Sequence, residues 1–123
     1  MNKFLLAFFT ISALLITGCT TTNANTGYYW GNYSGTLYSL KTSPGKNSLD
    51  KHIEELQSII DYSNKKGIRV PPGVHAELGY RLAQTDRNSD AKAELNKEII
   101  TYPESRPFIE RVTIFLGLEG IYE

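Results

Sequence analysis

The chain has 123 residues, enough for one small domain and a targeting segment. Its 13 basic and 13 acidic side chains balance to a formal net charge of zero, which argues against the strongly basic surface of a nucleic-acid-binding protein. The single cysteine excludes an internal disulfide and a zinc site built from several cysteines.

The first 18 residues are predicted to be a signal peptide. Lys3 provides a positive charge, and residues 4–16 are apolar apart from Thr10 and Ser12. This apolar segment is shorter than the roughly 20 residues that a membrane-spanning helix needs, but its length suits a secretory signal. The sequence therefore predicts an exported protein.

The motif Ile16-Thr17-Gly18-Cys19 resembles the lipobox of bacterial lipoproteins. The resemblance implies that Cys19 receives diacylglycerol, that the chain is cleaved before it, and that the new N-terminus is acylated, for example with palmitate. It also implies the outer membrane as destination, because Thr20 stands where an Asp would direct inner-membrane sorting, and we expect the domain to face the periplasm. The alternative is an ordinary secreted protein in which Cys19 carries no lipid.

Two segments of low regularity are predicted next. Residues 19–27 are small and polar and should form a flexible tether. Residues 28–47 are predicted to be an irregular segment, because Gly31 and Gly35 disfavour a regular helix. Two interpretations of the aromatic residues here stay open: they cover the helices, or they form a patch for docking a partner, with Trp30 as the leading candidate. These residues are Tyr28, Tyr29, Trp30, Tyr33 and Tyr38.

Residues 48–118 are predicted to form an all-α domain. An amphipathic helix over 48–66 should end at Gly67, with His52 on its solvated side. The turn at 70–73 precedes a second helix over about 73–85, and a third helix should end before Pro103. A fourth helix follows. The expected buried side of the first helix is Leu49, Ile53, Leu56, Ile59 and Ile60, and that of the fourth is Phe108, Ile109, Val112, Phe115 and Leu116.

The second and third helices match the spacing of the tetratricopeptide repeat. The matching positions are His75, Leu78, Gly79, Leu82, Ala91, Leu95 and Pro103. Gly79 and Ala91 are small residues where the two helices are expected to approach most closely. A shift of 34 residues carries His75 to Ile109, so the fourth helix corresponds to the first half of another repeat. The predicted architecture is a tetratricopeptide-like hairpin between an N-terminal amphipathic helix and a C-terminal capping helix.

The order of these parts also resembles a family of small bacterial outer-membrane lipoproteins of unknown function. The resemblance rests on Tyr29-Trp30-Gly31, the helix over 48–66, the turn at 70–73, and the motifs at 75–80 and 102–105. Members of that family are often encoded beside a lipoprotein like the curli secretion channel. The resemblance therefore implies a role in an envelope assembly.

Catalytic chemistry is not indicated by the sequence. It contains no nucleotide-binding fingerprint, nucleophile motif or histidine–cysteine metal pattern, so we expect no enzyme activity, no cofactor and no metal. Glu94 and Glu98 are expected on a solvated face rather than as an acid–base pair.

The function expected from the sequence is that of a membrane-tethered module that binds another envelope protein. Its candidate binding residues are Trp30, Tyr80 and Arg81, with Glu77 beside them. The alternative is a structural or surface-exposed lipoprotein without a binding groove. A small hydrolase or ligand-binding protein is a third possibility, and it would need a pocket of several hundred Å³ with converging polar groups.

Overall fold

The structure, a computed structural model, describes residues 27–119. This part of the chain forms five α-helices and one short 3₁₀ helix and contains no strand, so the prediction of an all-α fold is confirmed. The helices are α2 (Tyr33–Thr42), α3 (Lys46–Lys66), α4 (Val74–Ala83), α5 (Asn88–Thr101), η1 (Pro103–Ser105) and α6 (Arg106–Phe115). The signal peptide, the motif at Ile16 to Cys19 and most of the tether lie outside the described residues.

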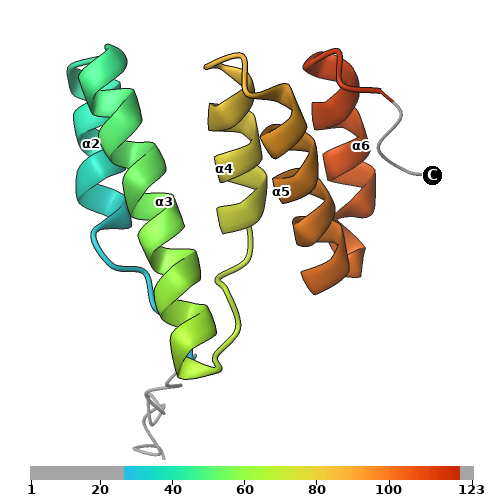
Figure 1. The fold of residues 1–123 in the computed structure, drawn as a ribbon, viewed down its shortest axis with the longest axis horizontal. Coiled ribbons are helices and arrows are strands. Elements are labelled where there is room, and N and C mark those ends of the chain that lie inside the picture. Colours follow the sequence, from blue (N-terminus) through green and yellow to red (C-terminus); the bar gives the residue numbers. More distant parts are fainter. Residues whose placement is uncertain (1–26, 120–123) are drawn as a thin grey trace, which may run out of the picture.

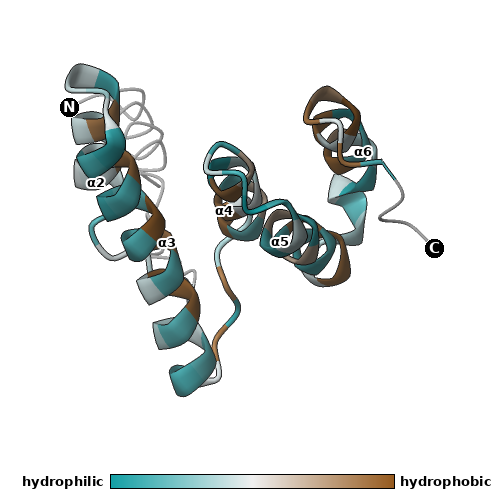
Figure 2. Ribbon diagram, turned by 45° about the horizontal axis from the view of Figure 1, so that its top comes forward, coloured by the Kyte–Doolittle hydropathy of each residue, from teal (hydrophilic) through white to brown (hydrophobic). Residues whose placement is uncertain are grey.

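The five α-helices lie side by side in chain order, and each runs antiparallel to the one before it (Figure 1). Each helix contacts its neighbour in sequence, and the closest pair is α4 with α5. The hydrophobic side of α3 faces α4 (Figure 2). Within residues 27–119, no helix has both the length and the hydropathy needed to cross a membrane.

The core lies between α3, α4, α5 and α6. Long aliphatic side chains fill it, and each is removed almost completely from solvent, which supplies the main driving force for folding. The residues at its centre are Leu56, Ile59, Val74, Leu78, Leu82, Ala91, Leu95 and Ile109. The buried side predicted for the helix over 48–66 is confirmed except at Leu49, which is only partly buried. Gly67 ends that helix in the left-handed conformation (φ 64°).

Helices α4 and α5 approach each other closely at Gly79. A Cβ atom placed there would lie 2.8 Å from Leu95 Cγ and 2.9 Å from the backbone oxygen of Ala91. Leu82 is buried in the same hairpin, and Pro103 begins η1 directly after α5 ends. The close approach predicted at Gly79 and Ala91 is thus present, whereas the assignment of this hairpin to the tetratricopeptide repeat stays a prediction.

The prediction of an irregular segment over 28–47 is wrong for Tyr33–Thr42, which form α2. The sequence of helix α2 has only a weak amphipathic pattern, and none of its residues is completely buried. Contacts with α3 hold it instead: the backbone N–H of Asn32 donates to Glu55 Oε1 (2.6 Å), and Thr36 Oγ1 lies 2.8 Å from His52 Nδ1. Tertiary contacts here outweigh the low helix propensity of Gly35.

The predicted solvated position of His52 is also wrong. Its side chain is fully buried (0% exposed), because α2 covers the side of α3 on which it lies. Since both α2 and α4 pack against α3, the buried part of the surface of α3 extends beyond the face that carries its aliphatic residues.

The expected solvated face at Glu94 and Glu98 is a third correction. Glu98 is buried, and its carboxylate accepts hydrogen bonds from the backbone N–H groups of Gly73 (2.8 Å) and Ala76 (3.2 Å). Helix α4 has no side-chain cap of its own, since Gly73 occupies its N-cap position. The carboxylate of Glu98 therefore satisfies N–H groups at the positive end of α4 from the neighbouring helix.

Candidate functional site

A cavity of about 510 Å³ opens between α2, α4 and α6, the three helices that run in the same direction. Its walls are mostly aromatic and aliphatic. They are formed by Trp30, Tyr33, Pro72, Gly73, Val74, Ala76, Glu77, Tyr80, Phe108 and Val112. A hollow of this size lies within the range of about 300–1,000 Å³ that is typical of binding sites.

Two of the three predicted binding residues line this cavity. Trp30 comes from the segment before α2 and is 41% exposed, and Tyr80 comes from the middle of α4. Arg81, the third, does not line the cavity but contacts two residues that do. Its guanidinium lies 5.1 Å from the centre of the Tyr80 ring and donates to Glu77. The predicted burial of Phe108 and Phe115 on the fourth helix is wrong: Phe108 is 60% exposed and lines the cavity together with Val112, and Phe115 is 79% exposed at the end of α6, where no packed neighbour among the described residues covers that side.

The aromatic residues before α2 play both roles considered from the sequence. Tyr29 stacks on Tyr62 of α3 with 3.8 Å between ring centres, and Tyr28 reaches the hydroxyl of Tyr102, so these two residues cover the helices. Trp30 packs edge-on against Tyr33 at 5.5 Å and keeps an exposed face. Trp30 is therefore the member of this segment that is best placed to contact another molecule.

A polar cluster joins α2, α3 and α4 at one wall of the cavity. We call it the Glu77 cluster; it consists of Tyr33, Thr36, His52, Glu77 and Arg81. The Glu77 carboxylate accepts from the Tyr33 hydroxyl (2.5 Å), from His52 Nε2 (3.0 Å) and from Arg81 Nη2 (3.1 Å). Because a carboxylate only accepts, Nε2 of His52 carries a proton, and Nδ1 of the same ring lies 2.8 Å from Thr36 Oγ1.

The electrostatics of this cluster favour an ionised Glu77. Burial alone would raise the pKa of Glu77, but hydrogen bonds from His52, Tyr33 and Arg81 outweigh it and lower the pKa to about 2. Burial and the adjoining carboxylate raise the pKa of Tyr33 to about 12. The charge in the cavity wall is therefore compensated by groups that already surround it, and the remaining lining is apolar.

The stability of the protein should fall in acid because of Glu77. Its pKa is lower when folded than when unfolded, so its contribution is present above the unfolded value near 4.5 and is lost as the pH falls toward 2. We expect the free energy of unfolding to drop by about 2 kcal/mol more between pH 5 and pH 2 in the wild type than in Glu77→Gln. Urea unfolding across this pH range measures the difference.

A milder variant serves as the control for this acid effect. Tyr33→Phe removes one of the three hydrogen bonds to Glu77 and should give a decline between those of the wild type and Glu77→Gln. Parallel declines in all three proteins would show that Glu77 does not carry the pH dependence.

The second histidine is also bonded to a carboxylate on a neighbouring helix. His75 Nδ1 lies 2.6 Å from Glu94 Oε2, and Lys97 Nζ donates to the other oxygen of Glu94 at 2.6 Å. Burial would raise the pKa of Glu94, but the hydrogen bonds from His75 and Lys97 lower it. His75 therefore adds a polar contact between α4 and α5 to its predicted packing role. Among residues 27–119, no group of three or more His, Cys, Asp or Glu side chains is arranged to hold a metal ion.

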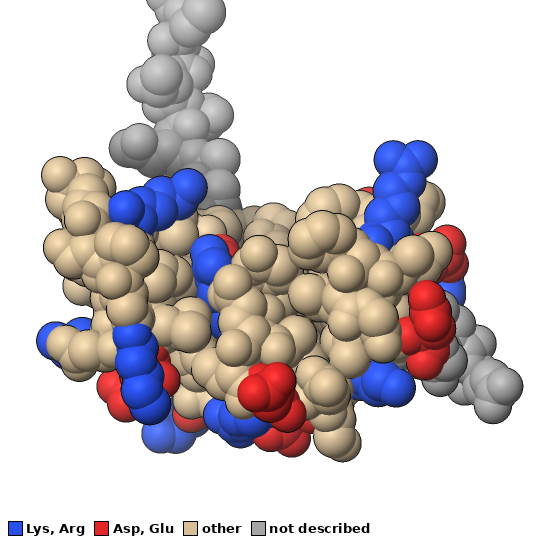
Figure 3. Space-filling model, turned by 90° about the horizontal axis from the view of Figure 1, so that it is seen from above, with Lys and Arg blue, Asp and Glu red and all other residues tan. Residues whose placement is uncertain are grey.

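A larger hollow of about 730 Å³ lies at the opposite end of the molecule, but its chemistry differs. Its lining includes Lys46, Asp50, Glu54, Asp86 and Arg87. Figure 3 looks onto this end and shows basic and acidic side chains interspersed across the surface. A ligand that bound in this larger hollow would have to displace water from charged side chains, which costs free energy. The aromatic cavity is therefore the better candidate site.

The Glu77 cluster was only partly visible in the sequence. Glu77 and Arg81 were placed near the candidate site and Tyr33 in the aromatic segment, but His52 and Thr36 were not placed near either. The one available signal was spacing: His52 precedes Leu56 by four residues, Ile59 by seven and Ser63 by eleven, and all four side chains are buried.

Comparison with known proteins adds a family but no activity. Residues 28–112 match the family model described as a domain of unknown function (DUF4810). No curated protein and no solved structure matches the chain. The matched range runs from the aromatic segment to Val112, and it therefore contains every residue that lines the cavity.

Proposed function

We propose that this chain, which belongs to the DUF4810 family of unknown function, is a lipid-anchored envelope protein that binds another protein through the aromatic cavity. The proposed role is non-enzymatic and consists of interaction or assembly. The observation that carries it is the convergence of Trp30, Tyr80 and Phe108, from three separate parts of the chain, on one apolar hollow. Aromatic side chains in a partly buried pocket are the commonest anchors of protein–protein binding.

The chemistry of the cavity supports an apolar side chain or short peptide segment as its occupant. The cavity meets the volume criterion for a small-ligand site. However, both carboxylate oxygens of Glu77 already accept hydrogen bonds from the surrounding cluster. A polar substrate would have to displace these internal bonds, whereas an apolar group would only exclude water.

The proposed setting is the outer membrane, on the periplasmic side. The lipobox-like motif ending at Cys19 supports it, and the resemblance to small envelope lipoproteins suggests a curli-secretion-channel-like lipoprotein as the first partner to test. A purely structural or surface-exposed role is the alternative, and it would leave the cavity without an occupant.

Photo-crosslinking in living cells tests the binding role. A photoreactive phenylalanine derivative in place of Tyr80 should form a discrete adduct, because position 80 lines the cavity. The same derivative in place of Phe115 is the matched control, since Phe115 is 79% exposed on α6 and does not line the cavity. Mass spectrometry of the adduct identifies the partner.

Truncation of a second wall residue shows whether the adduct depends on the cavity. Adding Trp30→Ala to the Tyr80 probe should reduce the yield at least tenfold, which corresponds to about 1.4 kcal/mol of binding free energy. Equal adducts at positions 80 and 115, or a yield that Trp30→Ala leaves unchanged, would contradict binding in the cavity. In that case the structural role would be favoured.

A further inference from the structure

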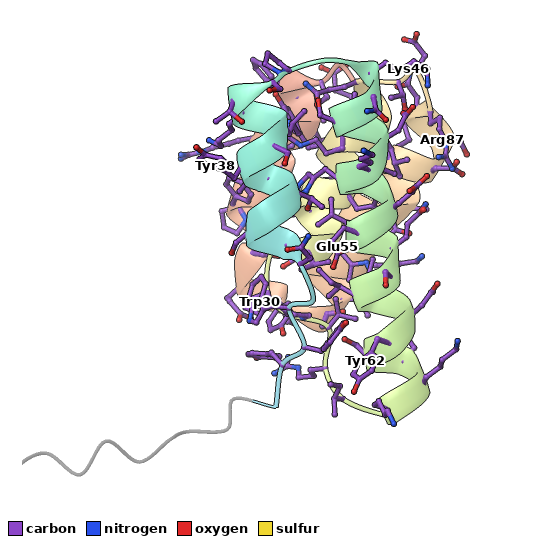
Figure 4. The ribbon with its side chains drawn as sticks, turned by 90° about the vertical axis from the view of Figure 1, so that its left-hand side faces the viewer. Trp30, Tyr38, Lys46, Glu55, Tyr62 and Arg87 are labelled. Atoms are coloured by element: carbon purple, nitrogen blue, oxygen red, sulfur yellow. The ribbon has the colours of Figure 1, made fainter. Side chains whose placement is uncertain are left out.

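One end of the molecule combines exposed aromatic and basic side chains. We call it the basal tip and define it as residues 28–30 together with residues 62–69, which are the end of α3 and the loop after it. Trp30 and Tyr62 lie at the end where the described chain begins, whereas Lys46 and Arg87 lie at the opposite end (Figure 4). The basal tip therefore lies at the end of the domain where the first described residues are found.

Within residues 27–119, the basic side chains of the basal tip are not neutralised by ion pairs. Among the described residues, Lys65, Lys66 and Arg69 form no ion pair with an acidic side chain. At the opposite end, Lys46 pairs with Asp50 and Arg87 pairs with Asp90, whereas Lys41 and Lys51 also form no ion pair with an acidic side chain among the described residues.

The guanidinium of Arg69 is held in place without being neutralised. It lies 4.5 Å from the centre of the Tyr102 ring and donates to the backbone oxygen of Thr101 (2.6 Å). Asp61 is the one acidic residue between positions 61 and 69, so this stretch carries a net positive charge. Glu104 and Arg106, in and just after η1, contribute one charge of each sign.

The aromatic residues of the basal tip are partly exposed. Trp30 is 41% exposed and Tyr62 is 39% exposed, and the stacked Tyr29 holds the Tyr62 ring in place. Tryptophan and tyrosine rings favour the boundary between lipid headgroups and water, and neighbouring lysine and arginine side chains are attracted to anionic lipids.

The proposed lipid anchor would keep the basal tip close to a bilayer. Cys19 precedes Gly27 by eight residues, which span at most about 29 Å when extended. As a flexible chain they would have a root-mean-square length of about 16 Å. The basal tip would therefore stay within reach of the membrane surface at a high effective concentration.

We propose that the basal tip docks on an anionic phospholipid surface, with Lys65, Lys66 and Arg69 against lipid phosphates and with Trp30 and Tyr62 at the interface. This inference rests on the proposed lipid anchor. Trp30 belongs both to the basal tip and to the wall of the aromatic cavity. Docking would therefore hold that cavity beside the membrane, where a membrane-bound partner is found.

The chain's single tryptophan makes docking measurable in the intact acylated protein. The protein is reconstituted into phosphatidylcholine vesicles with or without phosphatidylglycerol, and quenching of Trp30 by brominated lipid is recorded. Quenching should be stronger with phosphatidylglycerol and should weaken as salt is added. Each basic residue at an anionic surface favours docking by about fivefold, so Lys65→Glu, Lys66→Glu and Arg69→Glu together should reduce quenching to the level in phosphatidylcholine alone.

The matched control reverses three basic residues at the other end. Lys41, Lys46 and Lys51 lie in the last turn of α2 and the first turns of α3, near the turn between them, and their replacement by Glu makes the same change in net charge. This control should retain the quenching. Equal quenching in the two kinds of vesicle, or an equal loss in both triple variants, would overturn the docking. Absent quenching in both would point to a protein as the occupant of the basal tip.

Failure of the anchor and failure of the docking can be told apart. The intact mass of the purified protein shows whether it carries acyl chains. If it carries them and Trp30 is not quenched, the docking is wrong and the anchor stands. If it carries none, the anchor is wrong, and sedimentation of the same protein and of both triple variants with phosphatidylglycerol vesicles decides whether the basal tip binds them.

Discussion

Replacing Glu98 with alanine should lower the free energy of unfolding by about 2–4 kcal/mol. The substitution leaves the N–H groups of Gly73 and Ala76 without their acceptor at a largely buried site, and each such loss costs about 1–3 kcal/mol. It also removes a negative charge from the positive end of α4. Urea unfolding followed by circular dichroism measures the loss.

Two further variants separate the hydrogen bonds from other effects. Glu98→Gln keeps one acceptor oxygen and should lose about half as much stability as Glu98→Ala. Glu54→Ala replaces an exposed glutamate of α3 and should change stability by less than about 0.5 kcal/mol. If Glu98→Ala is no more damaging than Glu54→Ala, the carboxylate does not hold the start of α4.

Gly79→Val should destabilise the protein by about 3 kcal/mol. The new side chain would overlap Leu95 and the backbone oxygen of Ala91, and the backbone atom can move only if α5 moves with it. Overpacking of this kind exceeds the gain of up to about 1 kcal/mol that replacing a helical glycine brings through propensity. Thermal and urea unfolding measure the change.

Alanine at two glycines provides a control of opposite sign. Gly79→Ala should still be destabilising, because its Cβ meets the same atoms of α5. The three atoms nearest to a Cβ at Gly35 in α2 all belong to the side chain of Asn32, which can turn away, so Gly35→Ala should be neutral or stabilising by up to about 1 kcal/mol. Stabilisation by alanine at both positions would show that α4 and α5 are not closely packed at Gly79.

Local patterns in the sequence were reliable where a helix buries one aliphatic face. Leu56, Ile59 and Ile60 recur at helical spacing, and α3 buries them. Gly79 and Ala91 predicted a close approach from the sizes of their side chains, and the structure has it. These inferences succeed because the spacing of apolar residues along a helix, and the presence of a small side chain, can both be recognised within a short stretch of sequence.

Polar residues were harder to place because their burial depends on partners far away in sequence. His52, Glu77 and Glu98 all look like surface residues in a hydrophobicity pattern. Each is buried or half-buried because a group on another helix completes its hydrogen bonds. Burial of a polar group costs free energy unless such a partner is present, and a local pattern contains no record of that partner.

By itself, the sequence determined the all-α class, most of the helices after residue 47, the small residues between α4 and α5, and the lipobox-like motif that motivates the proposed anchor. The tertiary structure alone decided that Tyr33–Thr42 are helical, that Glu98 caps α4, and that Trp30, Tyr80 and Phe108 surround one cavity. The physical reason is the range of the interactions. Helix formation and side-chain periodicity act between residues a few positions apart, whereas the cavity and the buried carboxylates depend on contacts between segments separated by more than 20 residues.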